Sequence, residues 1–192
     1  MAEKKLNTVR INAGEWRSRM LKFPDAVGLR PTPERVRQTV FNWLGQDLTG
    51  LSCLDLFAGT GVMGFEALSR GAISTTLVEK SAPAYMALLE NKLLLKAERA
   101  LVLHQDALVF LNAYSQNDSL QKFDLIFLDP PYHQQWLPKV LPLLKFCLRS
   151  EGHIYVESEY SLDSAPELVD GWQIIKQSKA GNVFYHLLKL LK

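Results

Sequence analysis

The string Asp129-Pro130-Pro131-Tyr132 follows the apolar run 123–128 and joins an acid, two prolines and an aromatic ring. An exocyclic amine of a nucleic-acid base is a poor nucleophile, because its lone pair is delocalised into the ring. The Asp129 carboxylate and the Pro130 carbonyl can accept both amine N–H bonds and aim that lone pair, and the prolines fix these acceptors. Tyr132 offers a ring on which an extruded base can stack. We therefore predict Asp129, Pro130 and Tyr132 as the catalytic residues of amine methylation; the alternative is a rigid turn with a core tyrosine.

A second string with chemical meaning is Asp55–Gly64 (D-L-F-A-G-T-G-V-M-G), which leaves a predicted strand and enters a predicted helix. Gly59, Gly61 and Gly64 have the G-x-G-x-x-G spacing of a dinucleotide-type loop. Glu79 ends the next predicted strand, 20 residues after Gly59, where a ribose-binding carboxylate belongs. The spacing indicates an adenosine-containing cofactor, against the alternative of a tight turn that merely requires glycine.

Asp55 favours S-adenosylmethionine over a nicotinamide cofactor. A carboxylate at the mouth of the loop repels a pyrophosphate and attracts the ammonium of a methionine moiety. Asp55 can alternatively hold the turn through the backbone. Asp106 ends the third predicted strand, where it can accept the adenine amino group or cap the following helix. The residues that we expect to contact the cofactor are Asp55, Phe57, Gly59, Gly61, Glu79, Asp106 and Ala107.

The elements that position these strings alternate in type from about residue 50. Strands are expected at 51–57, 75–79, 100–104, 123–128 and 153–157, with helices at 62–70, 82–97, 107–114 and 135–148 and a closing antiparallel hairpin at 172–177 and 183–190. Such alternation with continuous apolar strands predicts an α/β fold, a mostly parallel sheet with helices on both faces. Both strings then lie at carboxyl ends of strands, where such sheets bind ligands. The helix at 82–97 is expected to carry an apolar stripe of Met86, Leu89, Leu93 and Ala97.

Residues 1–45 form a predicted extension before a domain at 46–192. A hairpin is expected at 9–23 and a helix at 34–44, with Thr32 as its N-cap and Pro33 as its first residue. The extension has nine Lys or Arg against four Asp or Glu, hence +5, whereas the rest has thirteen against sixteen, hence −3. Arginine suits bidentate phosphate contact, so we expect an RNA-binding surface; surface ion pairs are the alternative. The expected RNA contacts are Arg10, Arg17, Arg19, Arg30, Arg35 and Arg37.

Composition excludes several classes of protein. The 192 residues are 47% hydrophobic and 22% charged, as in an ordinary globular protein. No apolar run has transmembrane length, and the first residues lack the apolar core of a signal peptide. Cys53 and Cys147 are read as core residues, and the four scattered histidines show no metal-ligand spacing. We expect a cytoplasmic protein without a metal.

The strings Asp55–Gly64 and Asp129–Tyr132, in that order along the chain, resemble the class I D-P-P-Y amino-methyltransferases, which have a Rossmann-like fold. The whole chain is similar to the bacterial small-subunit ribosomal RNA guanine-N2 methyltransferases of the RsmD type. The segments that carry this similarity are Arg10–Arg19 (R-I-N-A-G-E-W-R-S-R), Leu29–Leu44 (L-R-P-T-P-E-R-V-R-Q-T-V-F-N-W-L), Leu54–Arg70 and Ile154–Glu159. At position 132 close relatives can carry phenylalanine. The resemblance implies a seven-stranded sheet, a monomer, and methylation of one guanine of 16S ribosomal RNA, of the G966 type, in a partly or fully assembled small subunit.

Three other functions compete with this one. A DNA adenine-N6 or cytosine-N4 methyltransferase shares the Asp129–Tyr132 string but usually carries a sizeable target-recognition domain, for which 192 residues leave no room. A nicotinamide oxidoreductase would need residues for hydride chemistry, and Asp55 opposes it. An RNA-binding module without activity has no use for both strings.

Overall fold

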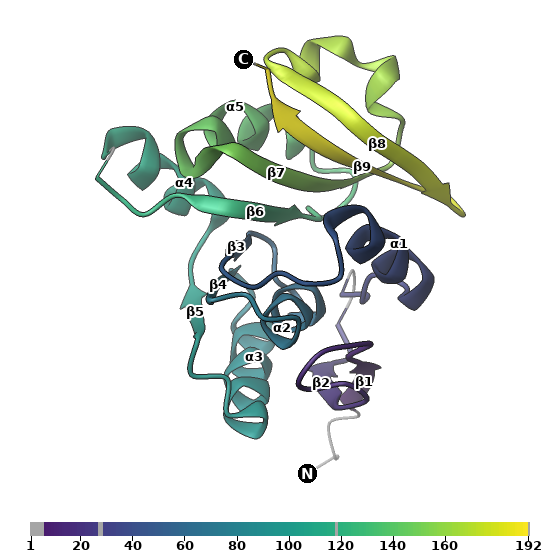
Figure 1. Cartoon of the computed structure of the whole chain (residues 1–192), viewed down its shortest axis with the longest axis vertical. Coiled ribbons are helices and arrows are strands. Elements are labelled where there is room, and N and C mark those ends of the chain that lie inside the picture. The colour runs from purple at the N-terminus through teal and green to yellow at the C-terminus, as the bar shows by residue number, and fades with distance from the viewer. Residues whose placement is uncertain (1–5, 27–28, 118, 192) are drawn as a thin grey trace.

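A seven-stranded sheet carries the fold in the computed structural model, which describes residues 6–26, 29–117 and 119–191. Its order is β5-β4-β3-β6-β7-β9-β8; the first five strands are parallel, and β9 runs antiparallel to both β7 and β8 (Figure 1). The expected α/β class with a closing hairpin is confirmed. The strands are β3 (Ser52–Asp55), β4 (Ser74–Glu79), β5 (Ala100–His104), β6 (Phe123–Leu128), β7 (Leu148–Ser158), β8 (Trp172–Ala180) and β9 (Val183–Leu190).

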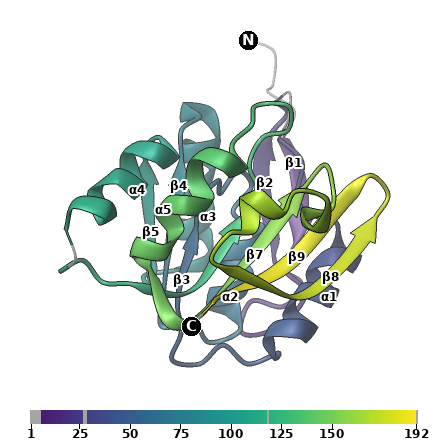
Figure 2. The ribbon, with the colours of Figure 1, turned by 90° about the horizontal axis from the view of Figure 1, so that it is seen from above.

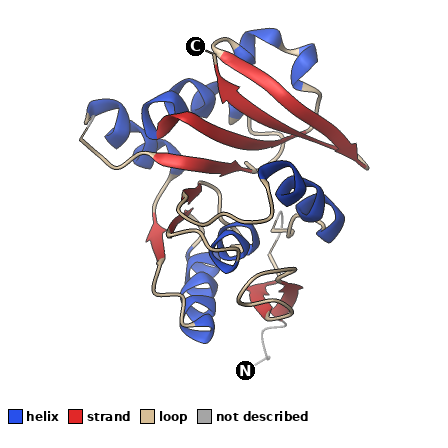
Figure 3. Ribbon diagram, viewed as in Figure 1, coloured by secondary structure: helices blue, strands red, loops and turns tan. Residues whose placement is uncertain are grey.

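Helices cover both faces of this sheet (Figures 2 and 3). They are α1 (Glu34–Leu44), α2 (Val62–Ser69), α3 (Ala82–Leu95), α4 (Ala107–Gln116) and α5 (Leu137–Cys147), with short 3₁₀ turns at Leu162–Ser164 and Pro166–Val169. The side chains of a strand alternate between two apolar cores. Cys53 and Phe127 face α1, α2 and α3, whereas Leu54 and Leu128 face α4 and α5. Within the described ranges, no helix is long and apolar enough to cross a membrane.

The N-terminal hairpin consists of β1 (Leu6–Arg10) and β2 (Met20–Pro24), shorter than expected, and packs on α3. Asn91 of α3 accepts the N–H of Lys22 at 2.9 Å and donates to the Lys22 carbonyl at 2.7 Å. The hairpin and α1 contribute to the same core as α2 and α3. The extension is therefore built into the domain rather than placed beside it.

The hairpin also corrects the expected buried face of α3. Met86 is 54% and Leu93 78% exposed, whereas Leu88 and Asn91 are buried. The stripe was predicted wrongly at Met86 and Leu93, whereas Ala97 is buried; β2 packs on the face of α3 that carries Leu88 and Asn91.

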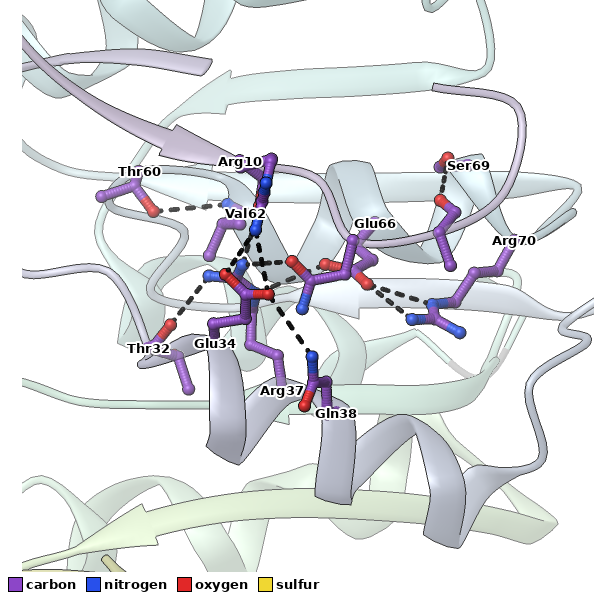
Figure 4. Close-up of polar contacts among 12 residues, drawn as sticks. Arg10, Thr32, Glu34, Arg37, Gln38, Thr60, Val62, Glu66, Ser69 and Arg70 are labelled. Carbon is purple, nitrogen blue, oxygen red and sulfur yellow. Dashed lines mark hydrogen bonds and ion pairs between the residues drawn. The ribbon is translucent and has the colours of Figure 1, made fainter. Parts of the chain in front are cut away.

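A buried ion triad joins the extension to α2 (Figure 4). The carboxylate of Glu66 lies 2.6 Å from the guanidinium of Arg70 and 3.3 Å from Nε of Arg37, and all three side chains are at most 3% exposed. Arg37 also donates to the carbonyls of Thr32 and Arg10 and to the side chain of Asn12. Arg37 was expected to contact RNA; that prediction is wrong, because its charge is neutralised inside the protein.

This triad predicts a large loss of stability for Glu66→Gln. The variant leaves two buried guanidinium groups without a negative partner, which should lower the free energy of unfolding by about 3–5 kcal/mol. The matched control is Glu34→Gln, because Glu34 pairs with Arg10 at 3.2 Å on the exposed surface. The control should cost less than about 1 kcal/mol. Urea denaturation measures the free energy of unfolding of both variants. Equal decreases would show that the buried triad stabilises the protein no more than the surface pair does.

Candidate functional site

Acidic side chains gather at the carboxyl edge of the sheet. Asp55 ends β3, Glu79 ends β4, Asp129 follows β6, and Glu157 is the second-last residue of β7. The order of the strands reverses between β3 and β6, because β4 and β5 lie on one side and β7 on the other. Open α/β sheets bind their ligands at such a point, so the expected position of the site is consistent with the fold.

The glycine loop has the conformation that its sequence predicts. Gly59 and Gly61 have φ of +52° and +74°, in the left-handed region that favours glycine. A Cβ atom on Gly61 would lie 2.4 Å from Cδ2 of Leu88 and 2.8 Å from the ring of Phe65. The residue at this position must therefore be glycine for α2 to start beside the sheet.

Two carboxylates accept the N–H groups of this loop. Asp55 Oδ2 accepts the N–H of Gly64 at 3.0 Å, and Glu79 Oε2 accepts the N–H of Gly59 at 2.8 Å. Asp55 is 5% exposed, so it does hold the turn. Burial raises its pKa to about 7, and Glu79 adds to the rise, although the bond from Gly64 opposes it. A loop whose N–H groups face carboxylates disfavours a diphosphate and fits a ligand that offers an ammonium group and hydroxyls.

The other expected cofactor contacts lie around this loop. Asp106 caps α4 by accepting the N–H of Leu108 at 2.9 Å, and it also binds Lys80 at 3.0 Å. Ala107, the first residue of α4, is buried. The ring of Phe57 meets that of Trp136 edge-on, with centroids 5.1 Å apart. Contact of Asp106, Ala107 and Phe57 with a cofactor stays a prediction.

Asp129 is a partly buried carboxylate that forms no side-chain hydrogen bond or ion pair with the residues that the structure describes. It follows Leu128, which pairs with Val156, so Asp129 and Glu157 are the next residues along two parallel strands. Withdrawal from solvent raises the pKa of Asp129 well above its ordinary value, and the nearby Glu157 and Asp55 raise it further. The strand end thus presents an acceptor that the protein itself leaves unused.

A cavity of about 370 Å³ opens beside this strand end. It lies between the segment after Asp129 and the segment after β7, and its lining includes Pro130, Tyr132 and Glu157. Tyr132 is 37% exposed and belongs to no core, so the alternative of a buried core tyrosine is wrong. Glu159 fixes the neighbouring backbone, because its two oxygens lie 2.9 Å from the N–H and 2.7 Å from Nδ1 of His133.

Sequence reasoning missed the roles of Glu157 and Thr32. Glu157 is 3% exposed, and its Oε1 accepts the hydroxyls of Tyr155 at 2.8 Å and Thr32 at 2.9 Å. Thr32 was expected to cap α1; instead Pro33 precedes the helix, without a side-chain cap, and the Thr32 hydroxyl is buried against β7. A carboxylate at the end of an otherwise apolar strand run is the pattern that could have indicated Glu157.

The structure divides the arginines of the extension. Arg30 and Arg35 are exposed, lack a partner among the described side chains, and flank Thr32 near the edge. Arg10 pairs with Glu34 on the surface. For Arg10, the structure therefore agrees with the alternative of a surface ion pair. Arg17 and Arg19 are exposed at the other end of the hairpin: Trp16 binds Ser69, the last residue of α2, and Arg19 donates to the carbonyl of Leu94 in the last turn of α3. The structure does not bring these two to the site.

Cys53 and Cys147 are free and buried, as expected of core residues. No group of three or more His, Cys, Asp or Glu in the described part of the chain is arranged to hold a metal ion.

Comparison with known proteins gives a consistent family. The family model described as conserved hypothetical protein 95 matches residues 9–189. Ribosomal RNA small subunit methyltransferase D of Escherichia coli (strain K12) is 40% identical over 181 residues, which cover 93% of this chain and 88% of that protein. The protein of the same name from Haemophilus influenzae is 40% identical over 183 residues, with coverage of 93% and 92%.

Solved structures agree with these sequence matches. That of the Escherichia coli protein yhhF has a TM-score of 0.84 at 38% identity and covers 96% of this chain and 98% of its own. A ribosomal protein L11 methylase from Lactobacillus delbrueckii has a TM-score of 0.68 at 19% identity, with coverage of 85% and 82%, and shows the fold alone.

The raised pKa of Asp55 predicts a pH dependence of stability. Between pH 3.8, the ordinary pKa, and about pH 7, the unfolded chain releases the proton of Asp55 while the folded chain keeps it. The free energy of unfolding therefore falls as the pH rises through this range, by up to about 4 kcal/mol. Asp55→Asn removes this contribution, so the difference between wild type and variant should change by that amount in urea titrations from pH 4 to 8.

Asp47→Asn is the control for this measurement. Asp47 is exposed, and hydrogen bonds from Thr49 lower its pKa, so its contribution changes only below about pH 4. Its difference from wild type should be flat over the same range. A flat difference for Asp55→Asn as well would mean that Asp55 ionises as an ordinary surface carboxylate does.

Proposed function

This chain belongs to the conserved hypothetical protein 95 family, the family of RsmD-type methyltransferases, and from that premise we propose that it methylates ribosomal RNA of the small subunit. We propose further that the acceptor is the N2 amine of one guanine in 16S ribosomal RNA, and that the donor is S-adenosylmethionine. The names of the two 40% identical relatives support the substrate class. The carboxylates of the glycine loop support a donor that carries an ammonium group and a ribose.

The residues of the loop would hold the donor by charge and hydrogen bonding. S-adenosylmethionine supplies a methyl group on a positively charged sulfur, which makes that methyl electrophilic. Glu79 would accept the ribose hydroxyls with the lone pairs that its bonds to Gly59 and Ser81 leave open. Asp55 would favour the ammonium, and Asp106 the adenine amino group.

Asp129 and Pro130 would act on the amine of the base. The Asp129 carboxylate and the Pro130 carbonyl accept hydrogen bonds from the two N–H groups of the amine. The lone pair of the amine then points toward the methyl group, which is catalysis by positioning. The new N–C bond forms as the methyl group leaves its carrier, and the nitrogen then loses one proton. Asp129 is suited to accept that proton, because its surroundings raise its pKa.

The observation that carries this proposal is the unused acceptor at the strand end. Asp129 lies where the strand order reverses, between the glycine loop and the cavity that Tyr132 lines. Asp129 is partly withdrawn from solvent and has no partner among the described residues, so a ligand that supplies a hydrogen-bond donor would stabilise it. Tyr132 would stack on the base that enters the cavity.

Transfer of a tritium-labelled methyl group tests this function. Purified protein is incubated with labelled S-adenosylmethionine and either naked 16S RNA or small subunits that lack the modification, and the nucleosides are then separated. We expect N2-methylguanosine from one position. Label in N6-methyladenosine or N4-methylcytidine would contradict the guanine proposal, and label in DNA alone would support the DNA methyltransferase instead.

Asp129→Ala should lower the rate of methyl transfer by on the order of 100-fold or more, because one preorganised acceptor is lost. Binding of S-adenosylmethionine, measured by calorimetry, should stay within a few-fold of wild type, since Asp129 faces the amine. Retention of a tenth of the wild-type turnover would refute the amine-holding role.

Glu79→Ala is the complementary variant in this comparison. It removes the carboxylate next to Gly59 and should weaken S-adenosylmethionine binding by about 1.5–3 kcal/mol. RNA affinity without the cofactor should hardly change. If both variants lost cofactor binding equally, the division between cofactor side and base side would be wrong.

Arg30 and Arg35 are proposed as phosphate contacts, because they are exposed beside the edge that holds Asp129. Replacing both with alanine should lower the slope of log RNA affinity against log salt by about 1–2 units. Arg17→Ala with Arg19→Ala makes the same change of charge at the far end of the hairpin and should leave the slope near wild type. A salt titration in which the two double variants give equal slopes would contradict this placement.

A further inference from the structure

The cavity beside Asp129 is lined by acidic residues, which repel a phosphate and can accept hydrogen bonds from N–H groups at the edge of a base. Its lining contains three acidic residues, Glu157, Glu159 and Glu167, and no lysine or arginine. Tyr132, Trp136 and Tyr160 add aromatic rings to the same lining. A base can stack on such rings, whereas the sugar–phosphate backbone would be repelled. The part of the substrate that enters is therefore rich in hydrogen-bond donors.

Glu157 is the buried member of these three acids. Both of its assigned hydrogen bonds, from Tyr155 and Thr32, go to Oε1. Oε2 has no hydrogen-bond partner among the described residues, and Glu157 is 3% exposed and is one of the residues that line the cavity. One oxygen thus anchors the carboxylate, while the other has no partner within the described part of the chain.

Glu157 and Asp129 point to the same face of the sheet. Side chains alternate along a strand, so Glu157 shares the face of Tyr155, and Asp129 continues the face of Phe127, both of which belong to the core under α1 and α2. Their closeness is also evident in the pKa of Asp129, which the charge of Glu157 raises. Asp129 and Glu157 end neighbouring strands, so a base whose amine binds Asp129 would bring a ring nitrogen beside that amine close to Glu157.

That ring nitrogen differs between bases. In guanine, N1 beside the N2 amine carries a hydrogen and is a donor, whereas adenine and cytosine have an unprotonated acceptor beside their amine. A carboxylate accepts a bond from the first and repels the lone pair of the second. A site built to pair with a substrate N–H rejects an analogue that lacks it by large factors, because its buried acceptor is left unpaired.

Building on the proposed function, we propose that Glu157 determines the base: its Oε2 accepts the N1–H of guanine while Asp129 accepts the amine. Thr32 and Tyr155 bind the other oxygen of this carboxylate, Oε1, which takes no part in reading the base.

2-Aminopurine tests this assignment, because it keeps the amine at C2 but has an acceptor at N1. Small subunits are reconstituted with guanine or 2-aminopurine at the modified position, after the mapping described above has located it. The wild-type enzyme should prefer guanine by on the order of 100-fold or more in kcat/KM. In Glu157→Gln the side-chain amide can donate to N1 of the analogue, so the preference should fall at least tenfold. 2-Aminopurine also lacks the oxygen at C6 of guanine, but this difference is the same for wild type and variant, so the change in the ratio between them reports on N1.

Thr32→Val is the matched control, because it removes one bond to Glu157 and keeps the carboxylate. It should melt at a lower temperature but keep the wild-type preference. An unchanged preference in Glu157→Gln, or an equal fall in Thr32→Val, would overturn the base-reading role and leave Glu157 a structural residue. If Glu157→Gln does not fold, the wild-type enzyme alone decides, since equal transfer to guanine and 2-aminopurine overturns the inference. A wild-type enzyme that leaves guanine unmodified would overturn the proposed function itself.

Discussion

The order of the strands is the constraint on which the site depends. Because β3 lies between β4 and β6, the connections from β3 and from β6 depart on opposite sides, and the carboxyl edge between them stays open. Asp55, Asp129 and Glu157 meet there on one face. Burial raises the pKa of each, and the charges of Glu157 and Asp55 raise that of Asp129 further, so this edge costs stability when its carboxylates ionise. An edge of this kind is retained where a ligand with donors and positive charge can compensate for it.

The N-terminal segment packs against the carboxyl edge of the sheet and contacts residues of the candidate site. Glu66 binds Arg37 of α1 and Arg70 of its own helix, and so ties the extension to the helix that starts at the glycine loop. From the same segment Thr32 reaches Glu157, and a Cβ atom on Gly59 would lie 3.0 Å from the side chain of Leu29. The segment from Leu29 to Thr32 thus contacts both the glycine loop and the carboxylate beside Asp129. A shift of this segment would alter both regions.

Local patterns predicted the parts of the site that depend on neighbouring residues. The glycine loop and the Asp129–Tyr132 string each follow a buried strand, and each of these strands is recognisable in the sequence as a continuous apolar run. The parts that depend on distant residues were not predictable. The sequence of α1 does not show that the Arg37 side chain lies opposite Glu66 of α2. In α3 the buried face contains Asn91 because β2, some 70 residues earlier, covers it. The position of Glu157 beside Asp129 follows from the pairing of β6 with β7, which the sequence does not show directly.

A structure of the enzyme on the small ribosomal subunit with S-adenosylhomocysteine would test the central claim most directly. One guanine is expected to be extruded from the RNA into the cavity lined by Tyr132 and Glu157. Its N2 should lie within hydrogen-bond distance of the Asp129 carboxylate and the Pro130 carbonyl, with N1 facing Glu157. A target base bound outside this cavity, or one whose amine points away from Asp129, would contradict the account.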